Sequence, residues 1–250
     1  MDTLSIGTHI DALDAAGKAL LDAAAAAGPD AQVATCPGWQ VRDLLRHTTM
    51  VHRWATVHVA EGHTSPQPDG GEPDLDGEEL LAYVREGHTR LVDALRSAPA
   101  DLTCWSFLPA PSPLAFWARR QAHETTVHRA DAESALATGP GPVDPAIAAD
   151  GVDELLRAFH GRDRSRVRSD VPRTLRVRAT DTGDAWTVRL SPDAPRTERN
   201  AEGPADCEIG GPADRLYLTL WNRLPQEAVT VTGDASLARL WREHSGITWS

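Results

Sequence analysis

The stretch Trp117-Ala-Arg-Arg-Gln-Ala-His-Glu124-Thr-Thr-Val-His128-Arg-Ala-Asp131 holds the most informative spacing in this sequence of 250 residues. Glu124 and His128 are four residues apart, so on a helix they lie on one face, one turn apart. Such a pair offers a carboxylate oxygen and an imidazole nitrogen to one divalent metal ion, and Zn²⁺ accepts both kinds of ligand. Asp131, about one turn further along, could orient an imidazole.

The same spacing also occurs as a solvated surface pair, so two interpretations are open. A bundle helix must bury one face, and Trp117 and Val127 flank the stripe that passes through Glu124. Buried charge is costly unless it is paired or bound to a metal. Burial of this stripe would therefore favour a metal site.

A third ligand should come from another helix, and His47 is the candidate. It lies in Asp43-Leu-Leu-Arg-His47, in an apolar-rich turn of a predicted helix. His52 follows five residues later, about 140° around the helix, so we do not expect these two histidines to share a metal. We expect His52 to be structural or near the surface. His88 is expected to be a satisfied core histidine.

Helical periodicity organises the first part of the chain. Apolar residues recur at helical spacing in four stretches, residues 6–24, 41–54, 80–95 and about 114–136. Loops rich in Gly and Pro, Gly62–Pro73 and Pro109–Pro113, lie between the later helices. This pattern predicts an up-and-down four-helix bundle whose long loops serve a site or an interface.

The pattern changes after Gly139-Pro140-Gly141-Pro142, so we place a domain boundary there, with one domain over residues 1–142 and a second over residues 143–250. Alternating apolar and polar residues in the second domain predict half-buried strands. The predicted strands are Thr174–Ala179, Trp186–Leu190, Asp206–Ile209 and Val229–Val231. The predicted helices are Ala146–Phe159, Pro212–Trp221 and Asp234–Glu243. The second domain is therefore expected to be α+β.

Composition excludes several classes of protein. The chain has 25 Lys and Arg residues against 36 Asp and Glu residues, which gives a net charge of −11. This charge argues against a general nucleic-acid binder, although the Arg-rich stretch Arg162–Arg178 could form a local basic patch. No stretch approaches the roughly 18–20 apolar residues of a membrane span, and no secretory signal is visible. The three cysteines form no CxxC pair, so a disulfide framework is not expected. We expect a cytoplasmic protein without nucleic-acid or membrane partners.

Two groups of residues together resemble the mycothiol-dependent maleylpyruvate isomerase family. The first group is Cys36-Pro-Gly-Trp39-x-Val-Arg-Asp-Leu44-x-x-His47, followed by Arg120-x-x-x-Glu124-x-x-x-His128-Arg-x-Asp131. The second is Gly211-Pro-Ala-Asp-Arg-Leu216-x-Leu-x-Leu-Trp221-x-Arg223, followed by Val229-x-Val-x-Gly233-Asp234. The resemblance covers most of the chain in the same order, and it is more specific for the family than for a substrate.

The resemblance implies a DinB-like, metal-binding four-helix domain followed by a smaller α+β domain related in shape to sterol-carrier folds. It also implies His47, Glu124 and His128 as the metal ligands, the same three residues that the spacing selects. The thiol partner would be mycothiol, the low-molecular-weight thiol of actinobacteria.

Three protein ligands on a tetrahedral Zn²⁺ ion leave one open position, as in catalytic zinc sites. A thiol in that position would lose its proton, because the cation stabilises the thiolate. By resemblance, the thiolate adds to the cis double bond of maleylpyruvate or a similar enoyl acid, and rotation and elimination then give the trans product. Alternatively, the metal could polarise a substrate carbonyl.

Two arginines are candidates for binding an anionic substrate. Arg120 lies one turn before Glu124, and Arg223 lies in the family-like segment of the second domain. Either guanidinium could hold a carboxylate through two hydrogen bonds, although each could equally form a surface salt bridge. Arg223 is the stronger candidate, because ligand sites often form between domains.

Other functions remain open at this point. A mycothiol S-transferase or conjugating enzyme could use the same site on another electrophile. A non-catalytic metal-binding or ligand-binding protein would bind metal and thiol without turnover. A helical domain without metal would require His47 and Glu124 to be exposed and far apart. The sequence indicates a small-molecule substrate and a thiol as partners and does not indicate an oligomeric state.

Overall fold

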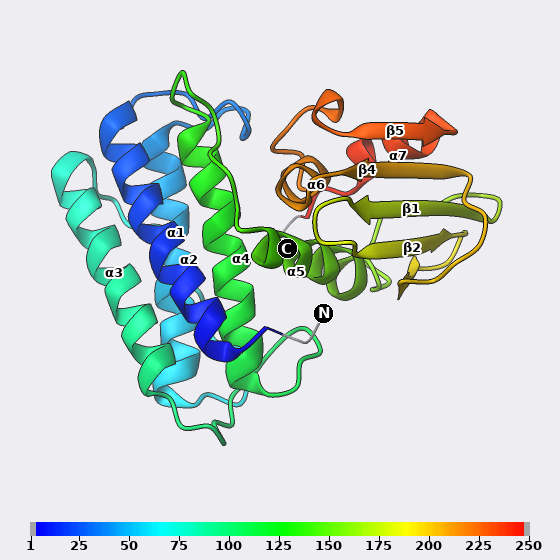
Figure 1. Ribbon diagram of the computed structural model, residues 1–250. Helices are drawn as coiled ribbons and strands as arrows, with labels where there is room; N and C mark the ends of the chain where they lie inside the picture. Colours follow the sequence, from blue (N-terminus) through cyan, green and yellow to red (C-terminus); the bar gives the residue numbers. More distant parts are fainter. Residues whose placement is uncertain (1–3, 248–250) are drawn as a thin grey trace. The chain divides into compact units, whose positions relative to one another are not determined.

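The computed structural model describes residues 4–247, which divide between Gly141 and Pro142 into two compact units (Figure 1). The first unit contains four long helices, α1 (Ile6–Ala27), α2 (Val41–Glu61), α3 (Gly77–Ser97) and α4 (Pro113–Glu133). The second unit contains a five-stranded sheet with helices. The predicted four-helix bundle followed by an α+β domain is therefore confirmed.

Polar side chains fix where the bundle helices begin. The Ser5 hydroxyl accepts a hydrogen bond from the Thr8 amide before α1, and the Ser112 hydroxyl accepts one from the Ala115 amide before α4. At the start of α2, the Asp43 carboxylate accepts a hydrogen bond from the Gln40 amide. These contacts satisfy amides that have no partner inside the helix. Gly62 ends α2 with a φ of 66°, in the left-handed region that favours glycine.

The direction of the helices differs from simple up-and-down alternation. Arg42 and Asp76, at the starts of α2 and α3, form an ion pair, and further along Arg53 lies 2.6 Å from Glu86. The helices α2 and α3 therefore run parallel. By contrast, Asp11 near the start of α1 pairs with Arg96 near the end of α3.

A long connection makes this parallel arrangement possible. A helix the length of α2, 21 residues, is about 32 Å long, so the chain must travel back along it before α3 can begin in the same direction. Residues 62–76, here named the crossover loop, are long enough, since 15 extended residues span up to about 50 Å. The loop length that the sequence shows is thus explained by topology.

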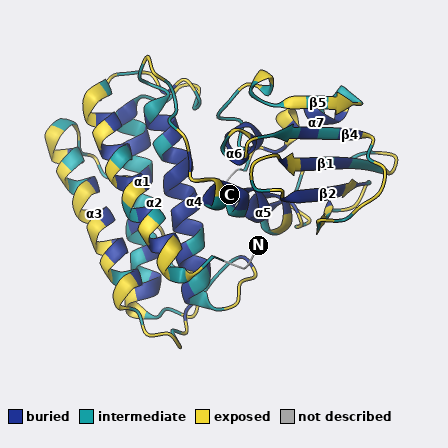
Figure 2. Ribbon diagram, viewed as in Figure 1, coloured by how far each residue is buried: buried dark blue, intermediate teal, exposed yellow. Residues whose placement is uncertain are grey.

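The bundle core is apolar near the start of α2. Its buried residues come from α1, α2, α3 and α4 and from the loop before α2; they are Leu20, Leu21, Ala23, Ala24, Val33, Val41, Leu44, Leu45, Leu80, Val84 and Ala132. Trp39 and Cys36 pack against this cluster, so the Cys-Pro-Gly-Trp turn is part of the bundle's structure. Most of α4 is buried, whereas α3 keeps an exposed face (Figure 2).

The second unit contains three α-helices, two short helical turns and five strands. In chain order these are α5 (Pro145–Asp153), η1 (Glu154–Phe159), β1 (Arg173–Ala179), β2 (Ala185–Leu190), β3 (Arg196–Arg199), β4 (Cys207–Gly211), α6 (Ala213–Leu220), η2 (Gln226–Ala228), β5 (Thr230–Gly233) and α7 (Ala235–His244). The sheet order is β3-β2-β1-β4-β5, with β1 and β4 parallel and the other neighbours antiparallel. The four predicted strands are present, and β3 is an additional one.

Strand register explains the two faces of the sheet. Val177 pairs with Trp186 on one side and with Ile209 on the other, and all three are buried. The alternate positions Arg178 and Arg189 are exposed, as period-two alternation requires. The predicted helix over residues 146–159 begins as α5 and continues as the π-helix η1. In the part of the chain that the structure describes, no helix has the length and apolar character needed to cross a membrane.

Candidate metal centre

The three predicted metal ligands meet inside the bundle. One ligand atom from each of His47 on α2 and Glu124 and His128 on α4 lies within 4.8 Å of the other two. The Oε1 atom of Glu124 is 3.1 Å from Nε2 of His128 and 3.7 Å from Nε2 of His47. Only 7% of Glu124 and 7% of His128 is exposed, which argues against a solvated surface pair.

These distances fit a tetrahedral ion. Zinc-to-ligand bonds of about 2.0–2.2 Å place neighbouring ligand atoms about 3.3–3.6 Å apart. The two separations from Glu124, 3.1 and 3.7 Å, lie close to that range. Two imidazole nitrogens and one carboxylate oxygen are also a donor set that catalytic zinc sites use.

The surroundings stabilise the charged forms of Glu124 and His128. Burial raises the pKa of Glu124, but hydrogen bonds with His128 and His47 and the charges of His128 and Arg120 hold that pKa well below its usual value. Burial lowers the pKa of His128, but hydrogen bonds and the negative charges of Asp131 and Glu124 raise it to about 9. In the metal-free protein the centre is a buried ion-pair network.

A chain of hydrogen bonds orients His128. Its Nδ1 atom lies 2.9 Å from Oδ2 of Asp131, which is fully buried. The other carboxylate oxygen of Asp131 accepts a hydrogen bond of 2.6 Å from the Thr35 hydroxyl, on the loop before α2. With its Nδ1 proton donated to Asp131, His128 directs Nε2 towards Glu124 and the other ligands, an arrangement found around many metal-binding histidines.

The two predicted substrate-binding arginines lie in different units. Arg120 is only 1% exposed, and its Nη2 is 3.1 Å from Oε2 of Glu124. This contact favours a role in holding Glu124 over the predicted role as a substrate clamp. Arg223 follows α6 in the second unit, is partly exposed, and donates from Nη1 to the Trp221 carbonyl at 2.8 Å.

His52 and His88 are both buried in the bundle core. The Nε2 atom of His52 is 2.8 Å from the Thr125 hydroxyl, and burial lowers the pKa of His52 to about 3. The structural role expected of His52 is therefore supported, and a surface position is not. The ring of His88 lies against Gly17, where a Cβ atom would overlap it. The predicted core position of His88 is therefore correct. Its Nε2 atom is 3.6 Å from Asp14 Oδ1, which is too long for a hydrogen bond.

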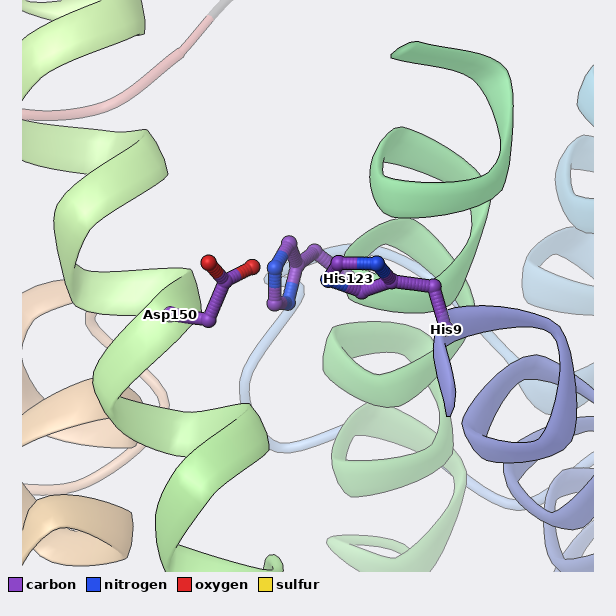
Figure 3. A group of neighbouring side chains, drawn as sticks. All are labelled: His9, His123 and Asp150. Carbon is purple, nitrogen blue, oxygen red and sulfur yellow. The ribbon is translucent and has the colours of Figure 1, made fainter. Parts of the chain in front are cut away.

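Two further buried histidines, His9 and His123, lie together outside the predicted centre. Their ring centroids are 6.0 Å apart, edge to face (Figure 3). His123 precedes Glu124 by one residue, about 100° around α4, so it faces another side of the helix. The spacing within the sequence gives no signal that His9 would meet it.

Comparisons with known proteins identify the family of the chain. Residues 10–133 match the mycothiol maleylpyruvate isomerase N-terminal domain, and residues 146–240 match the MDMPI C-terminal domain. The chain belongs to the mycothiol-dependent maleylpyruvate isomerase family. The family resemblance seen in the sequence is therefore confirmed.

Solved structures of this family share the fold. A crystal structure of the mycothiol-dependent maleylpyruvate isomerase superposes with a TM-score of 0.61 at 13% identity, covering 92% of this chain and 93% of that one. A point mutant of the isomerase gives a TM-score of 0.63 at 12% identity, with the same coverage. No curated protein sequence matches this chain. At such low identity the likeness shows the fold alone.

Proposed function

We propose that this protein is a metal-dependent, mycothiol-using enzyme that converts maleylpyruvate or a similar cis-enoyl acid into its trans isomer. The observation that carries the proposal is the convergence of His47, Glu124 and His128 within 4.8 Å in a member of this family. These side chains come from two helices and lie close enough together to give a metal ion three protein ligands. A tetrahedral ion would then keep its fourth position open for a thiol.

The chain's own residues would hold a divalent ion, most simply Zn²⁺, in a fixed geometry. A bound Zn²⁺ ion supplies positive charge that lowers the pKa of a thiol, so that mycothiol supplies a thiolate nucleophile. Arg120 holds the second oxygen of Glu124, and Asp131 holds the Nδ1 proton of His128. Because these contacts are buried, the metal-binding atoms of Glu124 and His128 are oriented before a metal ion binds.

Arg223 is the proposed carboxylate-binding residue. It belongs to the segment of the second unit that resembles the family, and its planar guanidinium can donate two parallel hydrogen bonds to a carboxylate. The Arg120 guanidinium already contacts the Glu124 carboxylate, so we propose that Arg120 positions Glu124 as a metal ligand.

The proposal is tested by measuring metal content and turnover together. Protein purified without chelator should contain about one Zn²⁺ ion per chain and should isomerise maleylpyruvate only when mycothiol is added. His128→Ala should lose both the metal and the activity. His244→Ala, which removes an exposed histidine from the last turn of α7, should keep both.

The outcomes separate the rival functions. Trans product with mycothiol recovered supports an isomerase, and mycothiol consumed into an adduct supports S-transfer instead. Metal binding without turnover of any tested cis-enoyl acid or electrophile supports a non-catalytic protein. Absence of metal from the parent, even after Zn²⁺ is added, would overturn the metal centre itself.

A further inference from the structure

The two histidines of the centre make the same pattern of contacts, although their rings are nearly perpendicular, with an interplanar angle of 78°. Each points Nε2 at the same atom, Oε1 of Glu124, and each points Nδ1 at a second carboxylate. For His128 that carboxylate is Asp131, at 2.9 Å. For His47 it is Glu72, whose Oε1 is 3.9 Å from Nδ1. The second pair repeats the first with a longer separation.

The two carboxylates differ in how firmly they are held. Asp131 lies on α4, is fully buried, and receives a second hydrogen bond from Thr35. Glu72 lies on the crossover loop, and 46% of its side chain is exposed. A half-exposed glutamate side chain has rotamers available, and a movement of about 1 Å would bring its oxygen within hydrogen-bond distance of Nδ1.

The crossover loop is attached to α2 on both sides of Glu72. Before it, the Gln67 amide donates to Nε2 of His58 at 3.3 Å, and the Gln67 carbonyl accepts from the indole of Trp54 at 2.8 Å. After it, the Leu75 carbonyl accepts two hydrogen bonds from Arg46, at 3.0 and 2.8 Å. These attachments keep Glu72 beside His47 while the segment between them follows the surface of the bundle.

We propose that Glu72 is a positioning residue of the metal centre. Its carboxylate accepts a hydrogen bond from the Nδ1 proton of His47 when metal is bound, and so fixes the tautomer and ring orientation that present Nε2 to the metal. This inference rests on the proposed function, because it requires His47 to be a metal ligand. It assigns the crossover loop a part in metal binding that its topological role does not require.

The competing explanation is a general effect of negative charge near a cation. An exposed pair of charges contributes little by itself, and the effect would be similar for any acidic residue at a similar distance. Asp74, two residues after Glu72 on the same loop, is exposed and provides the matched change of charge. Comparing variants at Glu72 and Asp74 therefore separates the effect of a specific hydrogen bond to His47 from the general effect of a nearby negative charge.

The test measures Zn²⁺ dissociation constants by competition with a chromophoric chelator, using the full chain. Glu72→Ala should weaken binding about 10- to 100-fold, the range for loss of a carboxylate that orients a metal-binding histidine. Glu72→Gln should weaken it less, because the amide oxygen still accepts from Nδ1–H. Asp74→Ala should change it by no more than about threefold.

A spectroscopic measurement supports the assignment independently of affinity. The Co²⁺-substituted Glu72→Ala protein should show visible absorption bands shifted from those of the parent, because the His47 ligand is reoriented, whereas Asp74→Ala should keep the parent's spectrum. Urea unfolding of the metal-free variants should match that of the metal-free parent, since both side chains are exposed. Equal metal affinities in Glu72→Ala and Asp74→Ala would overturn the inference. A parent protein that binds no Zn²⁺ would overturn the proposed function instead.

Discussion

Asp131 joins the candidate metal centre to a part of the chain almost 100 residues away. One of its oxygens lies 2.9 Å from His128 Nδ1, and the other accepts from the Thr35 hydroxyl at 2.6 Å. Asp131 also belongs to the family-like motif, and the spacing after His128 suggested that it could orient an imidazole. Its contact with Thr35 carries no signal in the spacing, because the two residues are brought together only when the loop before α2 folds against α4.

Replacing Asp131 by Asn should weaken Zn²⁺ binding about 10-fold, the lower end of the range for loss of an orienting carboxylate, because the amide oxygen still accepts from His128 Nδ1–H but the negative charge that favours this tautomer is lost. Chelator competition measures the dissociation constant, and maleylpyruvate turnover at saturating Zn²⁺ should recover in part. Ser134→Ala is the matched control: the Ser134 hydroxyl donates to the Asp131 backbone carbonyl and lies 3.2 Å from the Thr35 hydroxyl, so this variant changes the surroundings of Asp131 but keeps its carboxylate. Zinc affinity unchanged in Asp131→Asn would contradict the orienting role.

At the scale of elements, aromatic side chains hold the crossover loop. His58, at the end of α2, is fully buried, and its ring centroid lies 5.0–5.2 Å from those of Trp54, Trp105 and Trp117. Its Nδ1 lies 3.0 Å from the Trp54 carbonyl, and its Nε2 accepts from the Gln67 amide at 3.3 Å. These contacts fit a proton on Nδ1, which donates to the carbonyl, and a lone pair on Nε2, which accepts from the amide.

His58→Ala should therefore release the crossover loop. Loss of a buried ring and of its hydrogen bonds should destabilise the protein by roughly 3 kcal/mol, measured by urea unfolding. Under native conditions, cleavage within the crossover loop by a protease that cuts on the amino side of aspartate, where the loop offers Asp69, Asp74 and Asp76, should become faster. His63→Ala removes a partly exposed imidazole from the same loop, and its stability and cleavage rate should stay close to those of the parent. A slow, parent-like cleavage of His58→Ala would show that the loop is held elsewhere.

The elements themselves were largely predictable, and the exceptions have physical reasons. Regular apolar spacing and Gly and Pro punctuation predicted the four bundle helices because each helix buries one stripe. The strand β3 was missed because its residues, Arg196-Thr-Glu-Arg199, are polar and lie at a sheet edge, where no apolar face is needed. The parallel direction of α2 and α3 was not predictable, since the loop composition does not specify where the chain returns.

The candidate site was predictable to a similar extent. Helical spacing selected Glu124 and His128, and a position in an apolar-rich turn selected His47, because the geometry of a single helix determines which side chains share a face. Glu72 lies in an irregular loop without periodicity, so only tertiary structure reveals that it faces His47. Arg120 was identified for its charge, whereas its contact with Glu124 suggests a different role from the one predicted.

For the molecule as a whole, acid should act on a buried histidine of the second unit. His160 lies in the second unit, is 1% exposed, and packs against Trp241 with ring centroids 4.7 Å apart. Burial lowers its pKa to about 4; a hydrogen bond with the Ser245 backbone opposes this shift, and the Arg162 charge adds to it. The Nδ1 atom lies 3.0 Å from the Ser165 hydroxyl.

The second unit should therefore lose stability as the pH falls from 6.5 towards 4. Above pH 6.5 the histidine is neutral in both states and contributes no pH dependence; below it, the unfolded chain binds a proton that the folded chain does not accept until about pH 4. Between pH 7 and pH 5 this difference amounts to about 2 kcal/mol.

Hydrogen-exchange mass spectrometry of β1 and α7 peptides at increasing urea concentrations gives the free energy of unfolding of this unit at each pH. His160→Gln should lower the free energy of unfolding at both pH 7 and pH 5 through lost packing, but it should reduce the difference between the two values by about 2 kcal/mol. The control His244→Gln, which changes an exposed histidine, should keep the parent's pH dependence. An unchanged slope in His160→Gln would mean that other groups carry the acid sensitivity of this unit.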